Sequence, residues 1–146
     1  MIRKATLGDL PHLTALVCNH LADDSTDIKD HVSFEFRACI GHKERTVYVA
    51  MDDRDECLGY ILVHWIPFPL IKGHEGYISD LVVEEKHRGR GLGSDLMSAV
   101  EAEARQRRCC RLMLNNPKKA ESYKRAFYKK RGFEEREHFS NFVKML

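Results

Sequence analysis

The chain has 146 residues, of which 43% are hydrophobic and 32% charged, and its formal net charge is +2. This length and composition predict a single globular domain spanning residues 1–146, with enough apolar side chains for a packed core. No run of 18 apolar residues occurs, and the first residues lack the apolar centre of a secretion signal. We therefore expect no membrane span and a cytoplasmic location.

The charge is unevenly distributed along the chain. Residues 84–136 carry 15 Lys and Arg against 8 Asp and Glu, so this stretch is at +7 and the remainder at −5. Such an asymmetry predicts a polyanion ligand for the basic half, but no alternation of aromatic and basic residues indicates nucleic acid. The five cysteines form no Cys-x-x-Cys pair and the eight histidines form no spaced cluster, so we expect reduced thiols and no metal site.

In the first half of the chain, hydrophobic spacing and turn residues predict one strand, two helices and a two-stranded hairpin. Residues 2–5 form a short strand, and Thr6 caps a helix whose apolar face comprises Leu10, Leu13, Val17 and Leu21. A polar, acidic linker leads to a second helix over residues 28–40, which ends at Gly41. Residues 46–51 and 57–66 are β-rich and flank a charged turn, which predicts an antiparallel hairpin.

The second half alternates strands and helices. The predicted elements are a strand at 77–83, a helix at 91–107, a strand at 111–114, a helix at 120–131 that ends at Gly132, and strand-like runs at 133–136 and 139–146. The order of elements combines an antiparallel meander with a β-α-β crossover. It predicts an α/β fold with a central mixed, largely antiparallel sheet flanked by helices.

A glycine-rich loop joins the strand at 77–83 to the helix that follows. Its glycines are Gly89, Gly91 and Gly93, which permit positive φ and allow a ligand to approach the backbone. The following helix has an apolar face made of Leu92, Leu96, Val100 and Ala104. A loop of this kind presents free N–H groups and the positive end of a helix dipole, and Arg88 and Arg90 add donors suited to phosphate. The spacing matches neither a Walker loop nor a dinucleotide-binding fingerprint.

The order strand, Arg88-x-x-Gly91-x-Gly93, helix resembles the acetyl-CoA motif of the GNAT superfamily of N-acetyltransferases. Residues 126–133, AFYKKRGF, are similar to a second GNAT signature, a helix ending in Phe-Tyr-x-x-x-Gly-Phe. The two motifs occur in the expected order, and the resemblance covers essentially the whole chain. It implies acetyl-CoA as co-substrate, bound by loop amides, and strands that splay apart on either side of the loop helix to form a cleft. The implied cofactor-binding residues are Leu81, Val82, Val83, Arg88, Gly89, Arg90, Gly91, Leu92, Gly93, Ser94 and Asn116.

Acetyl transfer to an amine needs a neutral amine, a stabilised carbonyl oxygen and a proton for the departing thiolate. The resemblance makes Tyr128 the candidate general acid, five residues before Phe133. A backbone N–H of Leu81, Val82 or Val83 is the candidate oxyanion donor. Asp80 is the candidate base, with Glu75 just upstream. Ser79 occupies a position where some relatives have Glu, which leaves the base open.

The resemblance implies an acetyl-CoA-dependent N-acetyltransferase that acts on a primary amine of a small molecule, such as a polyamine-like amine, an aminoglycoside, an amino sugar or an aminoalkylphosphonate. A protein lysine or N-terminal acetyltransferase is the alternative enzyme, and a non-catalytic acyl-CoA-binding module is the alternative outside catalysis. The acidic cluster of Asp23, Asp24, Asp27 and Asp30 favours a cationic acceptor. We expect no nucleic-acid or membrane partner, and the apolar C-terminus suggests a homodimer.

Overall fold

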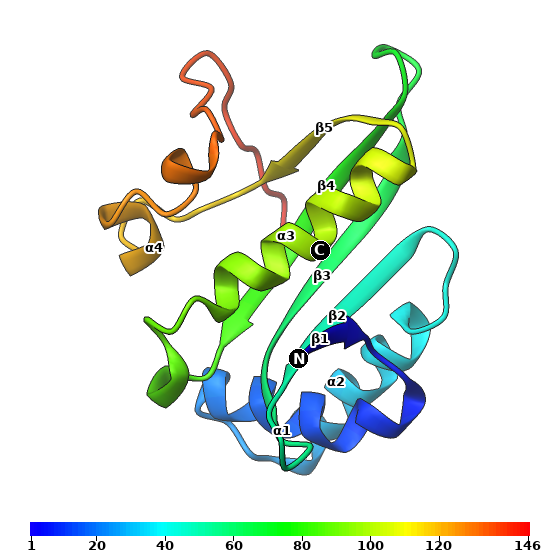
Figure 1. Cartoon of the computed structure of the whole chain (residues 1–146), viewed down its shortest axis with the longest axis vertical. Helices are drawn as coiled ribbons and strands as arrows, with labels where there is room; N and C mark the ends of the chain where they lie inside the picture. The colour runs from blue at the N-terminus through cyan, green and yellow to red at the C-terminus, as the bar shows by residue number, and fades with distance from the viewer. The chain divides into compact units, whose positions relative to one another are not determined.

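The computed structural model describes all 146 residues, whose contacts divide into two compact units, Met1–Leu114 and Asn115–Leu146. The first unit contains one five-stranded sheet of order β1-β2-β3-β4-β5 (Figure 1). Its strands are β1 (Ile2–Lys4), β2 (Arg45–Met51), β3 (Cys57–Pro67), β4 (His74–Val83) and β5 (Cys109–Leu114). The first four strands pair antiparallel, and β4 and β5 pair parallel. The predicted α/β fold with a mixed, largely antiparallel sheet is therefore confirmed.

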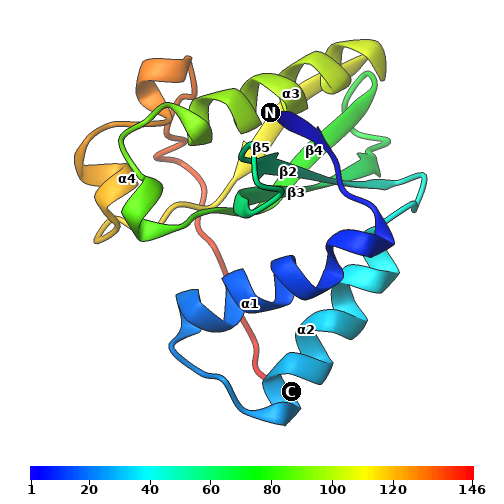
Figure 2. The same cartoon turned by 60° about the horizontal axis from the view of Figure 1, so that its bottom comes forward.

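Helices cover both faces of this sheet (Figure 2). Helices α1 (Leu10–Leu21) and α2 (Thr26–Cys39) lie on one face, and α3 (Leu92–Gln106) lies on the other. Two short 3-10 turns, η1 (Leu7–Asp9) and η2 (Glu85–His87), precede α1 and α3. Each element of this unit lies within a few residues of its predicted position, because the apolar spacing and the turn residues agree along the chain.

A capping arrangement fixes the start of α1. The carboxylate of Asp9 accepts hydrogen bonds from the backbone N–H and the hydroxyl of Thr6, at 2.7 and 2.9 Å. Arg3 of β1 donates two more, at 2.8 and 2.7 Å. Asp9 is buried, so these four bonds replace the water that the carboxylate loses. They tie the first strand to the first helix.

A buried carboxylate docks α3 on the sheet. Glu103 of α3 accepts hydrogen bonds from Thr46 and Tyr48 of β2, at 3.1 and 2.9 Å, and from Arg107, at 2.8 Å. Burial alone raises the pKa of Glu103, but the hydrogen bonds from Arg107, Tyr48 and Lys4 hold it below its usual value. The charge stays on Glu103, and α3 is held where its N-terminal loop meets the end of β4.

The second unit contains two short helical turns, α4 (Glu121–Lys124) and η3 (Lys129–Arg131). The predicted continuous helix over 120–131 is wrong, because Ala126 adopts a left-handed conformation with φ 54° and interrupts it. The strands predicted at 133–136 and 139–146 are also absent. The apolar residues of 139–146 fit a strand, but neither run pairs with a neighbouring strand, and strand structure requires such a partner.

Candidate active site

The sheet opens between β4 and β5, next to the glycine-rich loop. Parallel pairing runs from His74 opposite Cys109 to Ile78 opposite Leu114 and stops there. At the same point the β3–β4 register shifts and leaves Ser79 without a partner of its own. This is a β-bulge, which bends a strand and ends its pairing. The edge of β4 from Ser79 to Val83 therefore has no strand beside it, which agrees with the expected splay.

The backbone of this open edge presents two amides. The N–H of Glu84 donates to the carbonyl of Leu58 in β3 at 2.9 Å. Because donors alternate sides along an antiparallel strand, the N–H of Val82 also points toward β3, whereas those of Leu81 and Val83 point to the open side. Of the three candidate oxyanion donors, Leu81 and Val83 are thus placed on the open edge.

The glycine-rich loop has the geometry that an anion site requires. Gly89 and Gly91 have φ of 78° and 85°, and a Cβ built on either meets no atom within 4 Å. The first helical hydrogen bond of α3 runs from Asp95 N–H to the Gly91 carbonyl at 3.0 Å. The N–H groups that precede it are those of Leu92, Gly93 and Ser94. Open space above free N–H groups suits a pyrophosphate.

Arg88 and Arg90, both exposed, flank this space. The Nε of Arg88 donates to the carbonyl of Val83 at 3.0 Å, which ties the loop to the end of β4. Arg90 lies 3.4 Å from the ring of His87, which in turn is paired with Glu84. Each guanidinium uses only part of its five donors in these contacts, so both retain donors for an anion.

The candidate base lies in a chain of polar side chains at the bulge. The hydroxyl of Ser79 donates to Asp80 at 2.9 Å, and Nε2 of His64 in β3 lies 3.1 Å from the Ser79 oxygen. Sequence reasoning missed His64, because only the β3–β4 register brings it beside residues 79 and 80. Glu75, the other candidate carboxylate, is buried and paired with Arg111 of β5. It lies where β4 and β5 are still joined, so Asp80 is the better placed of the two.

Tyr128 belongs to the second unit and occupies a helix-ending motif. The N–H of Phe133 donates to the carbonyl of Tyr128 and that of Gly132 to Lys129, both at 3.0 Å, while Gly132 has φ 83°. These are the two hydrogen bonds of a Schellman cap, and the Tyr128 and Phe133 rings, 5.8 Å apart, supply its apolar contact. The spacing Tyr-x-x-x-Gly-Phe thus has a structural cause. Burial raises the pKa of Tyr128, an effect that Arg125 partly opposes.

Asn116 and the nearby lysines also lie in the second unit and are engaged within it. The side-chain oxygen of Asn116 accepts a hydrogen bond from Ser122 at 2.9 Å. Lys118 pairs with Glu135 at 3.1 Å, and Lys124 with Glu121 at 2.6 Å. This hydrogen bond holds the Asn116 side chain within its own loop.

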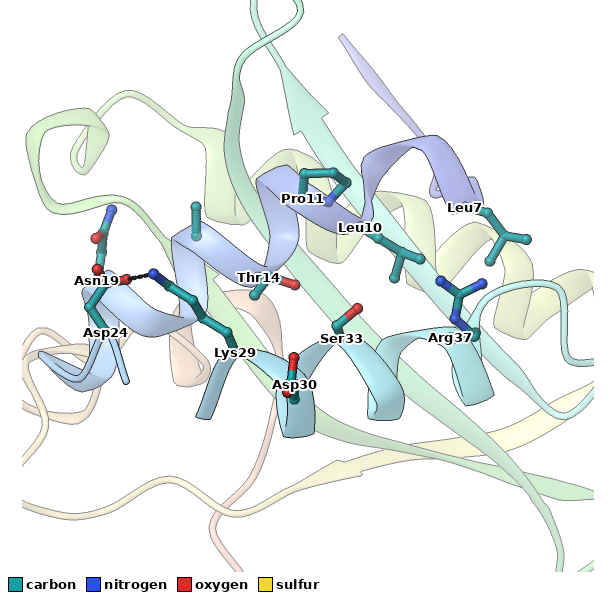
Figure 3. Close-up of a pocket in the computed structure, with 11 residues that line it drawn as sticks. Leu7, Leu10, Pro11, Thr14, Asn19, Asp24, Lys29, Asp30, Ser33 and Arg37 are labelled. Atoms are coloured by element: carbon teal, nitrogen blue, oxygen red, sulfur yellow. Dashed lines mark ion pairs between the residues drawn. The ribbon is translucent and has the colours of Figure 1, made fainter. Parts of the chain in front are cut away.

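A groove of about 560 Å³ lies between α1 and α2 (Figure 3). Its charged residues are Asp24, Lys29, Asp30 and Arg37, and Lys29 pairs with Asp24 at 2.8 Å. Asp23 is also engaged, since it accepts the backbone N–H of Ser25 at 2.9 Å. Positively charged side chains therefore lie beside the predicted acidic cluster, and the groove is not lined by charges of one sign only.

The family model described as Acetyltransferase (GNAT) family matches residues 14–133, most of the chain and all of the open-edge strand and glycine-rich loop. This chain belongs to the GNAT acetyltransferase family. GNAT acetyltransferases use acetyl-CoA as co-substrate, and the open β4 edge and the unhindered loop fit that ligand. No curated protein matches the chain, and no helix has the length and apolar character needed to cross a membrane.

Solved structures share the GNAT fold over nearly the whole chain. A predicted acetyltransferase with acetyl-CoA from Clostridium acetobutylicum has a TM-score of 0.77 and 20% identity, covering 98% of this chain and 95% of that one. A ribosomal-protein-alanine N-acetyltransferase from Brucella melitensis biovar Abortus 2308 has a TM-score of 0.77 and 18% identity, covering 100% of this chain and 98% of that one. An aminoglycoside acetyltransferase from an uncultured soil metagenomic sample has a TM-score of 0.79 and 18% identity, covering 100% of this chain and 95% of that one. At these identities the likeness concerns the fold alone.

Proposed function

We propose that this GNAT protein transfers the acetyl group of acetyl-CoA to a primary amine of a small molecule. One observation carries the proposal: the unpaired edge of β4 begins at Ser79, passes the free amides of Leu81 and Val83, and leads directly into the glycine-rich loop. A pyrophosphate held by the loop amides leaves the rest of the ligand to extend along this edge. The candidate base, Asp80, lies on the same edge.

The first role is binding. The amides of residues 89–94, with Arg88 and Arg90, hold the pyrophosphate, because free helix N-terminal N–H groups and guanidinium forks both suit phosphate. The amide of Leu81 or Val83 donates to the acetyl carbonyl oxygen as it becomes negative. One such donor is worth roughly 3 kcal/mol of transition-state stabilisation.

The second role is proton transfer. An alkylammonium ordinarily has a pKa of about 10.4, so the acceptor must lose a proton before its nitrogen attacks, and Asp80 accepts it. Tyr128 donates the proton that the departing thiolate needs. Its raised pKa keeps the phenol protonated at neutral pH, which is the form an acid requires. Asn116 supplies a further contact to the cofactor.

The acceptor is proposed from chemistry and from two structural neighbours. One neighbour is named for aminoglycosides and another for ribosomal-protein alanine, so the fold alone admits both a small molecule and a protein terminus. We favour a small amine of the polyamine, aminoglycoside, amino sugar or aminoalkylphosphonate type as the acceptor. We further propose a cytoplasmic location and a homodimer.

A thiol-release assay tests this function. Purified protein is supplied with acetyl-CoA and, in parallel, with small amines and with peptides bearing free lysines or N-termini. We expect thiol release and N-acetyl product with at least one small amine, and a rate about 10²-fold lower in Asp80→Asn. Asp53→Asn, in the exposed β2–β3 turn, is the matched control and should keep the parent rate. Turnover with peptides only would favour the protein acetyltransferase, and binding without any turnover would favour the acyl-CoA-binding module.

A further inference from the structure

A serine hydroxyl joins a carboxylate to an imidazole where β4 and β5 separate. Ser79 Oγ lies 2.9 Å from Asp80 Oδ2 and 3.1 Å from His64 Nε2. An ionised carboxylate can only accept hydrogen bonds, so the Ser79 hydroxyl donates to Asp80 at rest. The same hydroxyl faces the imidazole on its other side. Ser79 is exposed and His64 half-buried, so the chain leads from the open edge into the sheet surface.

The surroundings of His64 keep it neutral. In the sheet it lies opposite Arg45 of β2 and Tyr77 of β4, whose ring is 6.5 Å away. Burial first, and then the charge of Arg45, lower the pKa of His64, whereas Asp80 acts in the opposite direction. The charges of Arg45 and Asp80 also act on the thiol of Cys39 in α2. At neutral pH the imidazole is therefore uncharged, and in the tautomer that carries its proton on Nδ1 the lone pair of Nε2 faces Ser79 and can accept a proton.

We infer that His64, acting through Ser79, is the proton acceptor that returns Asp80 to its ionised form after it has deprotonated the amine. The inference rests on the proposed function and adds a positioning and relay residue to it. The ammonium N–H bond breaks as an O–H bond forms on Asp80. Asp80 then gives that proton to Ser79 Oγ while the Ser79 proton moves to Nε2, and His64 releases one proton to water. The relay balances for this ammonium proton, which leaves the amine as one proton reaches water, and no oxidant or reductant is required.

Asp80 must lose the proton that it took from the amine before it can act again, and the relay provides a route for that proton. Imidazole is ordinarily a stronger base than a carboxylate by more than two pKa units, a margin that burial and Arg45 narrow for His64, so the imidazole is a suitable acceptor for the proton that Asp80 has taken. The resulting imidazolium donates to Ser79, which donates to the ionised Asp80. In this charged state each link of the chain is a hydrogen bond to or from an ion, and such bonds are stronger than neutral ones.

Kinetics with three variants test the relay. We expect His64→Gln and Ser79→Ala each to lower kcat about 10–10²-fold, with the KM for acetyl-CoA unchanged, and the double variant to be no worse than either alone. The acid-side inflection of the parent pH profile, below the ordinary histidine value of 6.5, should disappear in His64→Gln. His74→Gln, at the exposed start of β4, is the control and should retain that inflection.

A fluorinated acceptor separates proton transfer from a structural role. Fluorine beside the amine lowers its basicity, so the acceptor arrives neutral at pH 7.5 and needs no base to remove an ammonium proton. The relay predicts that His64→Gln and Ser79→Ala approach the parent rate with this acceptor. An equal deficit with both acceptors, or additive losses in the double variant, would overturn the relay while leaving the acetyltransferase proposal intact.

An NMR titration of the His64 ring measures its coupling to Asp80 without requiring catalysis. Asp80→Asn should lower the pKa of His64, because it removes the anion that favours the imidazolium. Ser79→Ala should also lower it, because the hydrogen-bonded link to Asp80 is cut. An unchanged pKa in both variants would overturn the coupling whatever the activity. A parent protein that acetylates no amine would overturn the proposed function, and with it the catalytic use of the relay, even where the coupling is seen.

Discussion

Tyr128 is packed edge-on against two phenylalanine rings, and this packing determines both its position and its proton affinity. The ring of Phe127 lies 5.0 Å from that of Tyr128, and the ring of Phe133 lies 5.8 Å from it. Burial among these rings disfavours the phenolate and raises the pKa of Tyr128 above its ordinary value of 10. A phenol held in this way keeps its proton over the whole neutral range.

The first prediction concerns this phenol. Tyr128→Phe keeps the ring and the Schellman cap but removes the proton, so kcat should fall by about 10²–10⁴-fold with little change in thermal stability. The parent rate should decline on the alkaline side only above pH 10, where the phenol ionises. Tyr123→Phe is the matched control, because Tyr123 binds Glu135 at the surface of the same unit. Unchanged turnover in Tyr128→Phe would remove Tyr128 from the mechanism.

The second prediction concerns the buried carboxylate of Asp9. Hydrogen bonds from Arg3 hold the pKa of Asp9 well below its ordinary value of 3.8. Because the pKa of Asp9 is lower in the folded than in the unfolded protein, the stabilisation by its carboxylate is present above pH 3.8. It is lost as the pH falls through the pKa of the folded state. Asp9→Asn should therefore lower the free energy of unfolding by about 2–3 kcal/mol at pH 7.

Urea denaturation at a series of pH values measures this effect. The difference between parent and Asp9→Asn should be constant from pH 7 to pH 5 and should narrow below pH 4. The control is Asp53→Asn, which removes an exposed carboxylate. A difference that does not change between pH 7 and pH 3 would show that the contribution of Asp9 is not electrostatic.

At the scale of elements, the part of the chain before residue 115 follows its sequence pattern closely, and the part after it does not. The glycine-rich loop, its helix and the preceding strand lie where residue spacing places them, because each has local signals that agree. The β4 bulge at Ser79 and the role of His64 depend on strand register, which no local pattern encodes. The predicted helix over 120–131 failed because its pattern is helical but one residue, Ala126, turns left-handed.

The third prediction follows from that residue. Ala126 closes a turn in which Phe127 N–H bonds to the Ser122 carbonyl at 2.9 Å, and this geometry favours glycine. Ala126→Gly should therefore stabilise the second unit by about 0.5–1 kcal/mol. Ala102→Gly, at an exposed position inside α3, is the control with the opposite sign and should cost about 1 kcal/mol. Hydrogen exchange of the amides in each unit measures both; destabilisation by Ala126→Gly would indicate a continuous helix.

At the scale of the whole molecule, the C-terminal segment carries several exposed apolar side chains. Phe142, Val143 and Met145 are 90%, 76% and 87% exposed. Clustered exposed apolar side chains often mark a protein–protein contact. The fourth prediction is that the protein forms a homodimer at micromolar concentration and that Phe142→Ser with Val143→Ser weakens it. Sedimentation showing only monomer for the parent would rule the dimer out.

The central claim is that acetyl-CoA binds through the amides of the loop at residues 89–94, and calorimetric titration of two glycine variants tests it most directly. Gly91 and Gly41 both have positive φ, 85° and 78°, and open space at the Cβ position, so Gly91→Val and Gly41→Val impose similar backbone strain. Only Gly91 lies in the loop; Gly41 follows α2. We predict that the parent and Gly41→Val bind acetyl-CoA with similar Kd, while Gly91→Val, folded by circular dichroism, binds at least about 10-fold more weakly, a loss of roughly 1.4 kcal/mol. Equal affinity in all three proteins, or no binding by the parent, would contradict the claim.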